Sequence, residues 1–145
     1  MNTPMPLNLN ALETSFDLVA PRGDELMDEF YSRLFAAAPA ARSLFPDDLG
    51  RQKRMLLAAL VLVRQSLRDL DAITPTLRRL GARHVAYGAR PEHYPLVGQV
   101  LIGSMAEVAG HAWRPEYEQA WTAAFELVAG AMLEGAASAR LPDAA

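Results

Sequence analysis

The sequence predicts an all-α fold with about six main helices. Apolar residues recur at spacings of three, four and seven along most of the chain, which is the period of an amphipathic helix. Proline stands where helices would begin, glycine stands where they would end, and the connecting segments are short. No stretch alternates polar and apolar residues as a half-buried strand does. With 145 residues, the chain is expected to form a single domain over 1–145 with loose ends at about 1–7 and 136–145.

The first half of the chain is expected to form three helices, a short turn and a corner. Asn10–Glu13 resembles a capping box, and Asp24 is expected to cap the second helix. Because residues 55–63 are apolar around nearly the whole circumference of the third helix, we expect that helix in the centre of the fold. The helices span about 10–19, 24–37 and 51–70, with the turn at 39–44 and the corner at 45–50.

The second half should contribute three more helices. Thr74 and Pro75 are a helix-start signal, and Gly88 can end the helix that follows. Pro115 is expected to open the last helix, which should pack against the helix before it as an antiparallel pair. The expected spans are 75–87, from Pro91 or Tyr94 to about 108, and 115–135.

Composition excludes several classes of function. The chain has no cysteine, so disulfides and thiolate chemistry are absent, which fits a reducing compartment such as the cytoplasm. A net charge of -3 gives no basic field, so we expect no nucleic-acid partner. The longest apolar run, 55–63, is too short to span a membrane, and the N-terminus shows no signal peptide.

One histidine stands out among the three in the chain. His84 follows Leu77 and Leu80 and precedes Tyr87 on the apolar stripe of a short helix, whereas His111 is expected in solvent and His93 at a helix start. No nucleophile motif, phosphate loop or two-histidine metal pair accompanies it. The residues alone leave two interpretations open: a core histidine bonded to a carbonyl, or a ligand to a metal whose other ligands come from a macrocycle such as haem.

A family resemblance favours the second interpretation. From about residue 12 to residue 133 the chain resembles the single-domain bacterial globins of the flavohaemoglobin-like group, with the family's motifs in the family's order. These motifs are Phe30–Phe35, Ser43–Pro46, Gln52–Leu56, Leu80–Gly88, His93–Gly98 and Ala120–Trp121. The resemblance implies a globin fold, a three-over-three helical sandwich around haem b.

The resemblance also implies a role for each site residue. His84 would be the proximal iron ligand, with its other ring nitrogen donating to a carbonyl near Leu80. Tyr31 and Gln52 would form the catalytic pair on the distal side, Tyr31 by donating a hydrogen bond to bound dioxygen. The residues implied to bind the cofactor are Phe45, Leu56, Leu80, His84, Tyr94 and Val97.

Alternatives to these roles stay open. Tyr31 could be a half-buried tyrosine with its hydroxyl at the surface, and Gln52 could point into solvent. The family's proximal glutamate corresponds to Ala136, and Glu134 cannot replace it because two residues rotate a helix position by about 200 degrees. His84 is therefore expected to be an ordinary neutral imidazole. The residues that could pair with the haem propionates are Arg83, Arg90 and Lys53.

The expected function is binding of dioxygen, nitric oxide and carbon monoxide, with turnover of nitric oxide to nitrate if an external reductase supplies electrons. A simple oxygen carrier or store, a gas sensor acting through a partner chain, and a helical interaction domain without haem are the alternatives. We expect no membrane partner, and a monomer or a homodimer.

Overall fold

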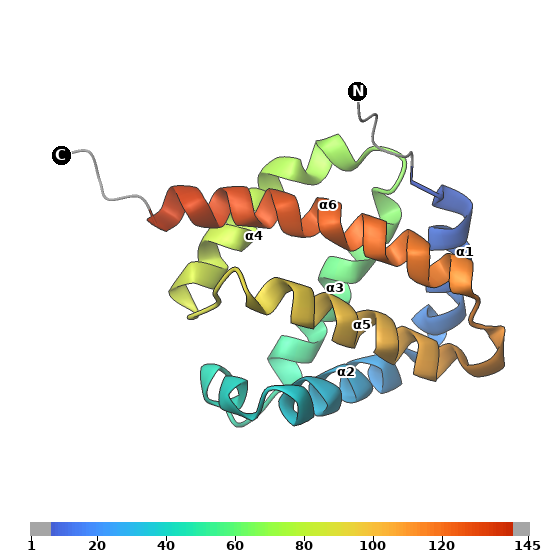
Figure 1. Cartoon of the computed structure of the whole chain (residues 1–145), viewed down its shortest axis with the longest axis horizontal. Helices are drawn as coiled ribbons and strands as arrows, with labels where there is room; N and C mark the ends of the chain where they lie inside the picture. The colour runs from blue at the N-terminus through green and yellow to red at the C-terminus, as the bar shows by residue number, and fades with distance from the viewer. Residues whose placement is uncertain (1–6, 141–145) are drawn as a thin grey trace.

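The computed structural model describes residues 7–140, and within them it contains helices and no strand (Figure 1). The predicted all-α class is therefore confirmed. Residues 1–6 and 141–145, which hold most of the expected loose ends, lie outside the described residues. The six α-helices are α1 (Leu9–Val19), α2 (Gly23–Ala37), α3 (Gly50–Gln65), α4 (Thr74–Ala86), α5 (His93–Ala109) and α6 (Pro115–Arg140). Short 3-10 turns connect them: η1 (Ala20–Arg22), η2 (Pro39–Leu44), η3 (Leu70–Ile73) and η4 (Gly110–Ala112).

The centre of the fold is α5 rather than the long apolar helix of the first half. Met105 of α5 is fully buried, and α1, α2 and α6 all pack against this helix. The prediction that the helix at 51–70 would be central is wrong, because only Leu60 and Val63 of α3 are buried and Met55 is 43% exposed. That helix also ends at Gln65. Several of the apolar side chains around α3 therefore lie on faces that the rest of the chain leaves partly exposed.

Several helix ends differ from the predicted caps. The first helix is capped by Asn8, whose Oδ1 accepts from the Ala11 amide at 3.1 Å, and not by Asn10. No side chain caps α2, because η1 leads directly into it at Gly23. The predicted stop at Gly88 is confirmed, since its φ of 90 degrees is open mainly to glycine and it follows the last turn of α4.

The last helix is longer than predicted and packs mainly on a different partner. α6 continues to Arg140, and Ala136, where we expected a loose tail, is 1% exposed. α6 and α5 run in opposite directions in Figure 1, with α3 crossing behind them. The most extensive helix pairing, however, joins α6 to α4. The backbones of these two helices are in direct contact at Gly81 and Gly135. This crossing was not predicted from the sequence.

A buried hydrogen-bond network ties α1 to α6. The Trp121 indole Nε1 donates to Ser15 Oγ at 2.7 Å, and that hydroxyl in turn donates to the Ala11 carbonyl at 2.6 Å. None of the helices within residues 7–140 has the length and apolar character needed to cross a bilayer.

Candidate functional site

Tyr31 lies inside a cluster of aromatic rings at the end of α2. The residue is 5% exposed, and its ring centroid is 5.8 Å from that of Phe45 and 6.0 Å from that of Phe35. Burial raises the pKa of the Tyr31 phenol to about 12, because the charged form loses its hydration. Within residues 7–140 no hydrogen bond engages this hydroxyl. Tyr31 is therefore a protonated donor at neutral pH, and the alternative of a half-buried surface tyrosine does not fit its burial.

The corner that carries Phe45 is held by Arg42. The guanidinium donates from Nη1 to the Phe45 and Pro46 carbonyls at 3.2 and 2.9 Å, and from Nη2 to the Asp47 carbonyl at 3.0 Å. Its carbon Cζ also lies 5.1 Å from the centre of the Phe35 ring. Sequence reasoning missed Arg42. The available signal was a basic residue just before a proline-containing corner that has few other ways to satisfy its carbonyls.

Gln52 and Leu56 lie one helical turn apart on the same face of α3, and both are partly buried. Leu56 packs against the main core. The neighbouring Lys53 ammonium lies 2.9 Å from Asp28 of α2, so its charge is already paired. Gln52 itself is partly buried, so its side chain is neither enclosed in the core nor fully in solvent.

His84 is partly buried on α4, and its ring is oriented by its own helix. Nδ1 lies 2.7 Å from the Leu80 carbonyl, so this nitrogen carries the proton and donates it. The other nitrogen, Nε2, is then a lone-pair donor, and within residues 7–140 nothing else hydrogen-bonds the ring. The Tyr87 ring meets the imidazole edge-on at 5.9 Å, but Tyr87 itself is 58% exposed. Among the described residues, Nε2 is thus the ring nitrogen that remains available to a ligand.

The start of α5 supplies Tyr94 and Val97. Tyr94 is 7% exposed with its hydroxyl fully buried, whereas Val97 is partly buried against the core. Glu134 is exposed and its carboxylate lies 2.9 Å from Arg78 Nη2, facing solvent. Ala136 is buried in the position that the family resemblance gives to a glutamate. In the part of the chain that the structure describes, no ion pair or hydrogen bond brings a carboxylate to His84.

The other candidate groups of the described residues do not form a metal site of their own. His93 Nδ1 accepts from the Arg90 amide at 3.1 Å at the start of α5, and His111 is exposed. Among residues 7–140, no three His, Cys, Asp or Glu side chains come together as a metal-binding group. Arg83 and Arg90 are exposed, and their guanidinium groups make no ion pair with another described residue.

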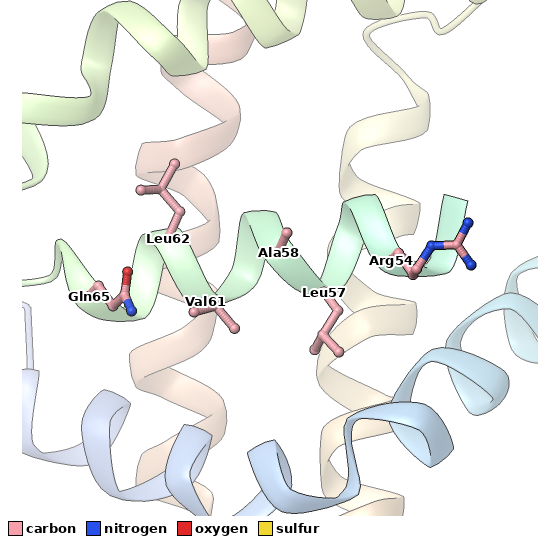
Figure 2. A pocket seen from close by; sticks show the side chains of 6 residues that line it. All are labelled: Arg54, Leu57, Ala58, Val61, Leu62 and Gln65. Atoms are coloured by element: carbon pink, nitrogen blue, oxygen red, sulfur yellow. The ribbon is translucent and has the colours of Figure 1, made fainter. Parts of the chain in front are cut away.

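An open groove of about 530 Å³ runs along α3 (Figure 2). It is lined by Arg54, Leu57, Ala58, Val61, Leu62 and Gln65. At 100 degrees per residue, most of these positions lie on the face of α3 opposite Gln52 and Leu56. Figure 2 shows Leu57 and Val61 pointing toward the neighbouring α1 and α2. The groove is therefore separate from the residues predicted to bind a cofactor.

The predicted site residues form two groups. One is the ring cluster of Tyr31 and Phe45, and the other is His84 with Leu80 on α4. No hydrogen bond or ring contact among residues 7–140 joins the two groups. In Figure 1 the turn after α2 lies at the lower left of the view and α4 above it, on the same side of α3, and a Cβ added at Gly88, just after α4, would lie 3.1 Å from Leu44 Cδ2 of this turn. Leu56, Leu80, His84 and Val97 all remain only partly buried.

Comparison with known proteins identifies the family. The globin family model matches residues 28–132. The chain is similar to a flavohemoprotein of Deinococcus radiodurans, with 34% identity over 77% of this chain and 28% of the relative. A flavohemoprotein of Vibrio cholerae is 28% identical over 88% of this chain and 33% of its own length. The chain thus spans about a third of the length of these relatives.

Solved structures agree with this result. An engineered carbene transferase built on a nitric oxide dioxygenase candidate of Rhodothermus marinus superposes with a TM-score of 0.83 at 26% identity, covering 94% of this chain and 95% of that one. A bacterial globin of Campylobacter jejuni shares the fold, with a TM-score of 0.79 at 20% identity over 90% of this chain and 94% of the other. The chain therefore belongs to the globin family of haem proteins and is related to the globin part of the flavohemoproteins.

Proposed function

We propose that this chain is a haem b protein that binds dioxygen, nitric oxide and carbon monoxide, and that it converts nitric oxide to nitrate when a separate reductase supplies electrons. The observation that carries the proposal is the state of His84. Its Nδ1 is committed to the Leu80 carbonyl at 2.7 Å, which leaves Nε2 as the coordinating atom on a half-buried apolar helix face.

The described residues fit haem better than a bare metal ion. A structural or catalytic metal ion needs three or more protein ligands, and residues 7–140 bring no such group together. A porphyrin carries its own ring of ligands and asks the protein for one imidazole and apolar walls. Leu56, Leu80 and Val97 are apolar side chains that the protein alone leaves partly exposed, so they can supply those walls.

The cofactor's charged edge can be met by arginine. Arg83 and Arg90 are exposed near His84 in the sequence and make no ion pair within the described residues, so both can bind a propionate. Lys53 is the weaker candidate, because its ammonium already lies 2.9 Å from Asp28.

Haem, when bound, supplies an iron at which a diatomic gas is held. Tyr31 is the side chain that we propose as a hydrogen-bond donor to this gas, because its phenol stays protonated and has no protein acceptor among residues 7–140. It can donate to a gas that carries partial negative charge. Gln52 would contribute as a second, adjustable donor from α3. In the overall reaction, one nitric oxide, one dioxygen and one electron combine to form one nitrate ion.

The relatives support this reaction. The D. radiodurans and V. cholerae proteins are described as flavohemoproteins, and the R. marinus protein is described in connection with nitric oxide dioxygenase activity. Those flavohemoproteins are about three times as long as the matched region.

Nitrate production under turnover tests the proposal. The purified haem-loaded chain is mixed with an unrelated flavin reductase, a nicotinamide donor, dioxygen and nitric oxide, and nitrate is measured over time. We expect catalytic nitrate formation, with Tyr31→Phe reducing the rate and raising the dioxygen dissociation rate about ten-fold or more, since a hydrogen bond to a charged acceptor contributes roughly 1.5–3 kcal/mol. Stable gas binding with no more than one nitrate per haem would instead support a carrier.

A further inference from the structure

The crossing of α4 and α6 brings two backbones into direct contact. A Cβ atom added at Gly81 would lie 1.8 Å from the Met132 carbonyl oxygen, and one added at Gly135 would lie 1.8 Å from the Arg78 carbonyl oxygen. Both glycines are buried. The obstructing atoms belong to helix backbones, which cannot rotate away as a side chain can. Each helix thus places a glycine against the other helix's main chain, one turn apart and in a reciprocal arrangement.

The crossing also has a lateral ion pair. Arg78 donates from Nε to Glu134 Oε2 at 3.0 Å, and its Nη2 lies 2.9 Å from the same oxygen. Both side chains are more than half exposed, so the pair adds little stability. The pair does link Glu134, the chain neighbour of Gly135, to Arg78, whose backbone Gly135 contacts. The ion pair therefore restricts rotation of α4 relative to α6 at the same point where the glycine contacts fix the distance between the two helices.

The crossing lies next to the group that orients His84. The carbonyl that accepts from His84 Nδ1 belongs to Leu80, and the peptide unit of that carbonyl ends at the Gly81 Cα. A movement of Gly81 away from α6 therefore moves the Leu80 carbonyl directly. Within residues 7–140 this carbonyl is the ring's single hydrogen-bond acceptor, and no carboxylate takes its place.

We infer that Gly81 and Gly135 are positioning residues for the proximal histidine. The contact of each glycine with the backbone of the opposite helix sets how closely the Leu80 carbonyl holds Nδ1 of His84, and through that hydrogen bond how strongly Nε2 donates to a metal. The inference rests on the proposed role of His84 as the haem ligand. It assigns the tuning of that ligand to helix packing, in a chain where the family's glutamate position is occupied by the buried Ala136.

The test is the iron–histidine stretching band of the ferrous, gas-free holoprotein, measured by resonance Raman spectroscopy. Gly81→Ala should shift the band to lower frequency, because a displaced Leu80 carbonyl weakens the bond to Nδ1 and makes the imidazole less electron-rich. Gly135→Ala should produce a smaller shift in the same direction, since Gly135 contacts α4 one turn away. It lies near the end of α6, where displacement of the last turn can relieve the clash, so this variant keeps the test open if Gly81→Ala does not fold.

Gly130→Ala is the matched control, because a Cβ at this position of α6 meets nothing within 4 Å. Its band should coincide with that of the unmodified protein. An equal band in all folded variants, even with reduced thermal stability, would show that the crossing is only structural and would overturn the inference. Failure of the proposed function looks different: the band would be missing from the unmodified protein or would persist in His84→Ala.

Discussion

The properties of Tyr31 follow from where α2 places it. A tyrosine in water would titrate near pH 10, but the rings of Phe35 and Phe45 replace water around this phenol and raise its pKa to about 12. The sequence could predict that Tyr31 lies on an inner helix face, because it shares the apolar stripe of α2. It could not predict the degree of burial, which depends on how the corner after α2 folds back.

The raised pKa of Tyr31 predicts a loss of stability in alkaline solution. Above pH 10 the unfolded chain releases the phenol proton while the folded chain keeps it, so the free energy of unfolding falls between about pH 10 and pH 12. The contribution lost is on the order of 2 kcal/mol. Denaturant titrations of the chain and of Tyr31→Phe, at pH 8 and at pH 11, measure it. The stability difference between the two proteins should change over this interval; parallel curves would contradict the burial of the phenol.

The hydrogen bond between Trp121 and Ser15 predicts a second effect of one residue. Ser15→Ala leaves the buried indole N–H without its acceptor and should lower the free energy of unfolding by about 1–3 kcal/mol. Ser138→Ala is the matched control, because this exposed hydroxyl bonds only its own helix and its removal should change stability by less than about 0.5 kcal/mol. Equal unfolding midpoints in urea for the two variants would show that the buried bond contributes nothing.

At the scale of helices and turns, the corner after α2 depends on Arg42. Its guanidinium satisfies three consecutive backbone carbonyls and stacks over Phe35. Arg42→Ala should therefore loosen Phe45, lower stability by roughly 1–2 kcal/mol and speed the loss of haem to an acceptor protein. Arg51→Ala, an exposed arginine for which residues 7–140 offer no ion pair, is the control. If haem is lost from both variants at the same rate, Arg42 does not support the site.

The predictions from sequence succeeded where local chemistry decides the outcome and failed where tertiary contacts decide it. Pro115 and Gly88 mark the start of α6 and the end of α4 as predicted, because their backbone constraints act locally. The all-round apolar stretch at 55–63 suggested a central helix, but the same pattern also fits a helix whose faces border a groove and the proposed cofactor site. The contacts of Gly81 with the Met132 backbone and of Gly135 with the Arg78 backbone join positions far apart in the chain, so no local pattern revealed them.

At the scale of the whole molecule, the packing of the helices explains how His84 alone could serve as the proposed haem ligand. α5 and the helices packed on it form the core, while α3 and α4 keep apolar side chains such as Leu56 and Leu80 partly exposed. The globin class and the list of site residues could be proposed from ordered motifs. The hydrogen bond from a ring nitrogen of His84 to a carbonyl near Leu80 was expected from the family resemblance and is confirmed, and the structure identifies that nitrogen as Nδ1.

The most direct test of the account is the haem content of His84→Ala, purified beside His93→Ala and His111→Ala as matched histidine controls. Haem per chain is measured from the Soret band and from extracted haem. We expect the two controls to carry haem as the unmodified chain does, and His84→Ala to lose it and to regain a Soret band when imidazole is added to fill the vacated position. Full haem content in His84→Ala, with an unchanged ferrous spectrum and no response to imidazole, would contradict the assignment of His84 as the haem ligand.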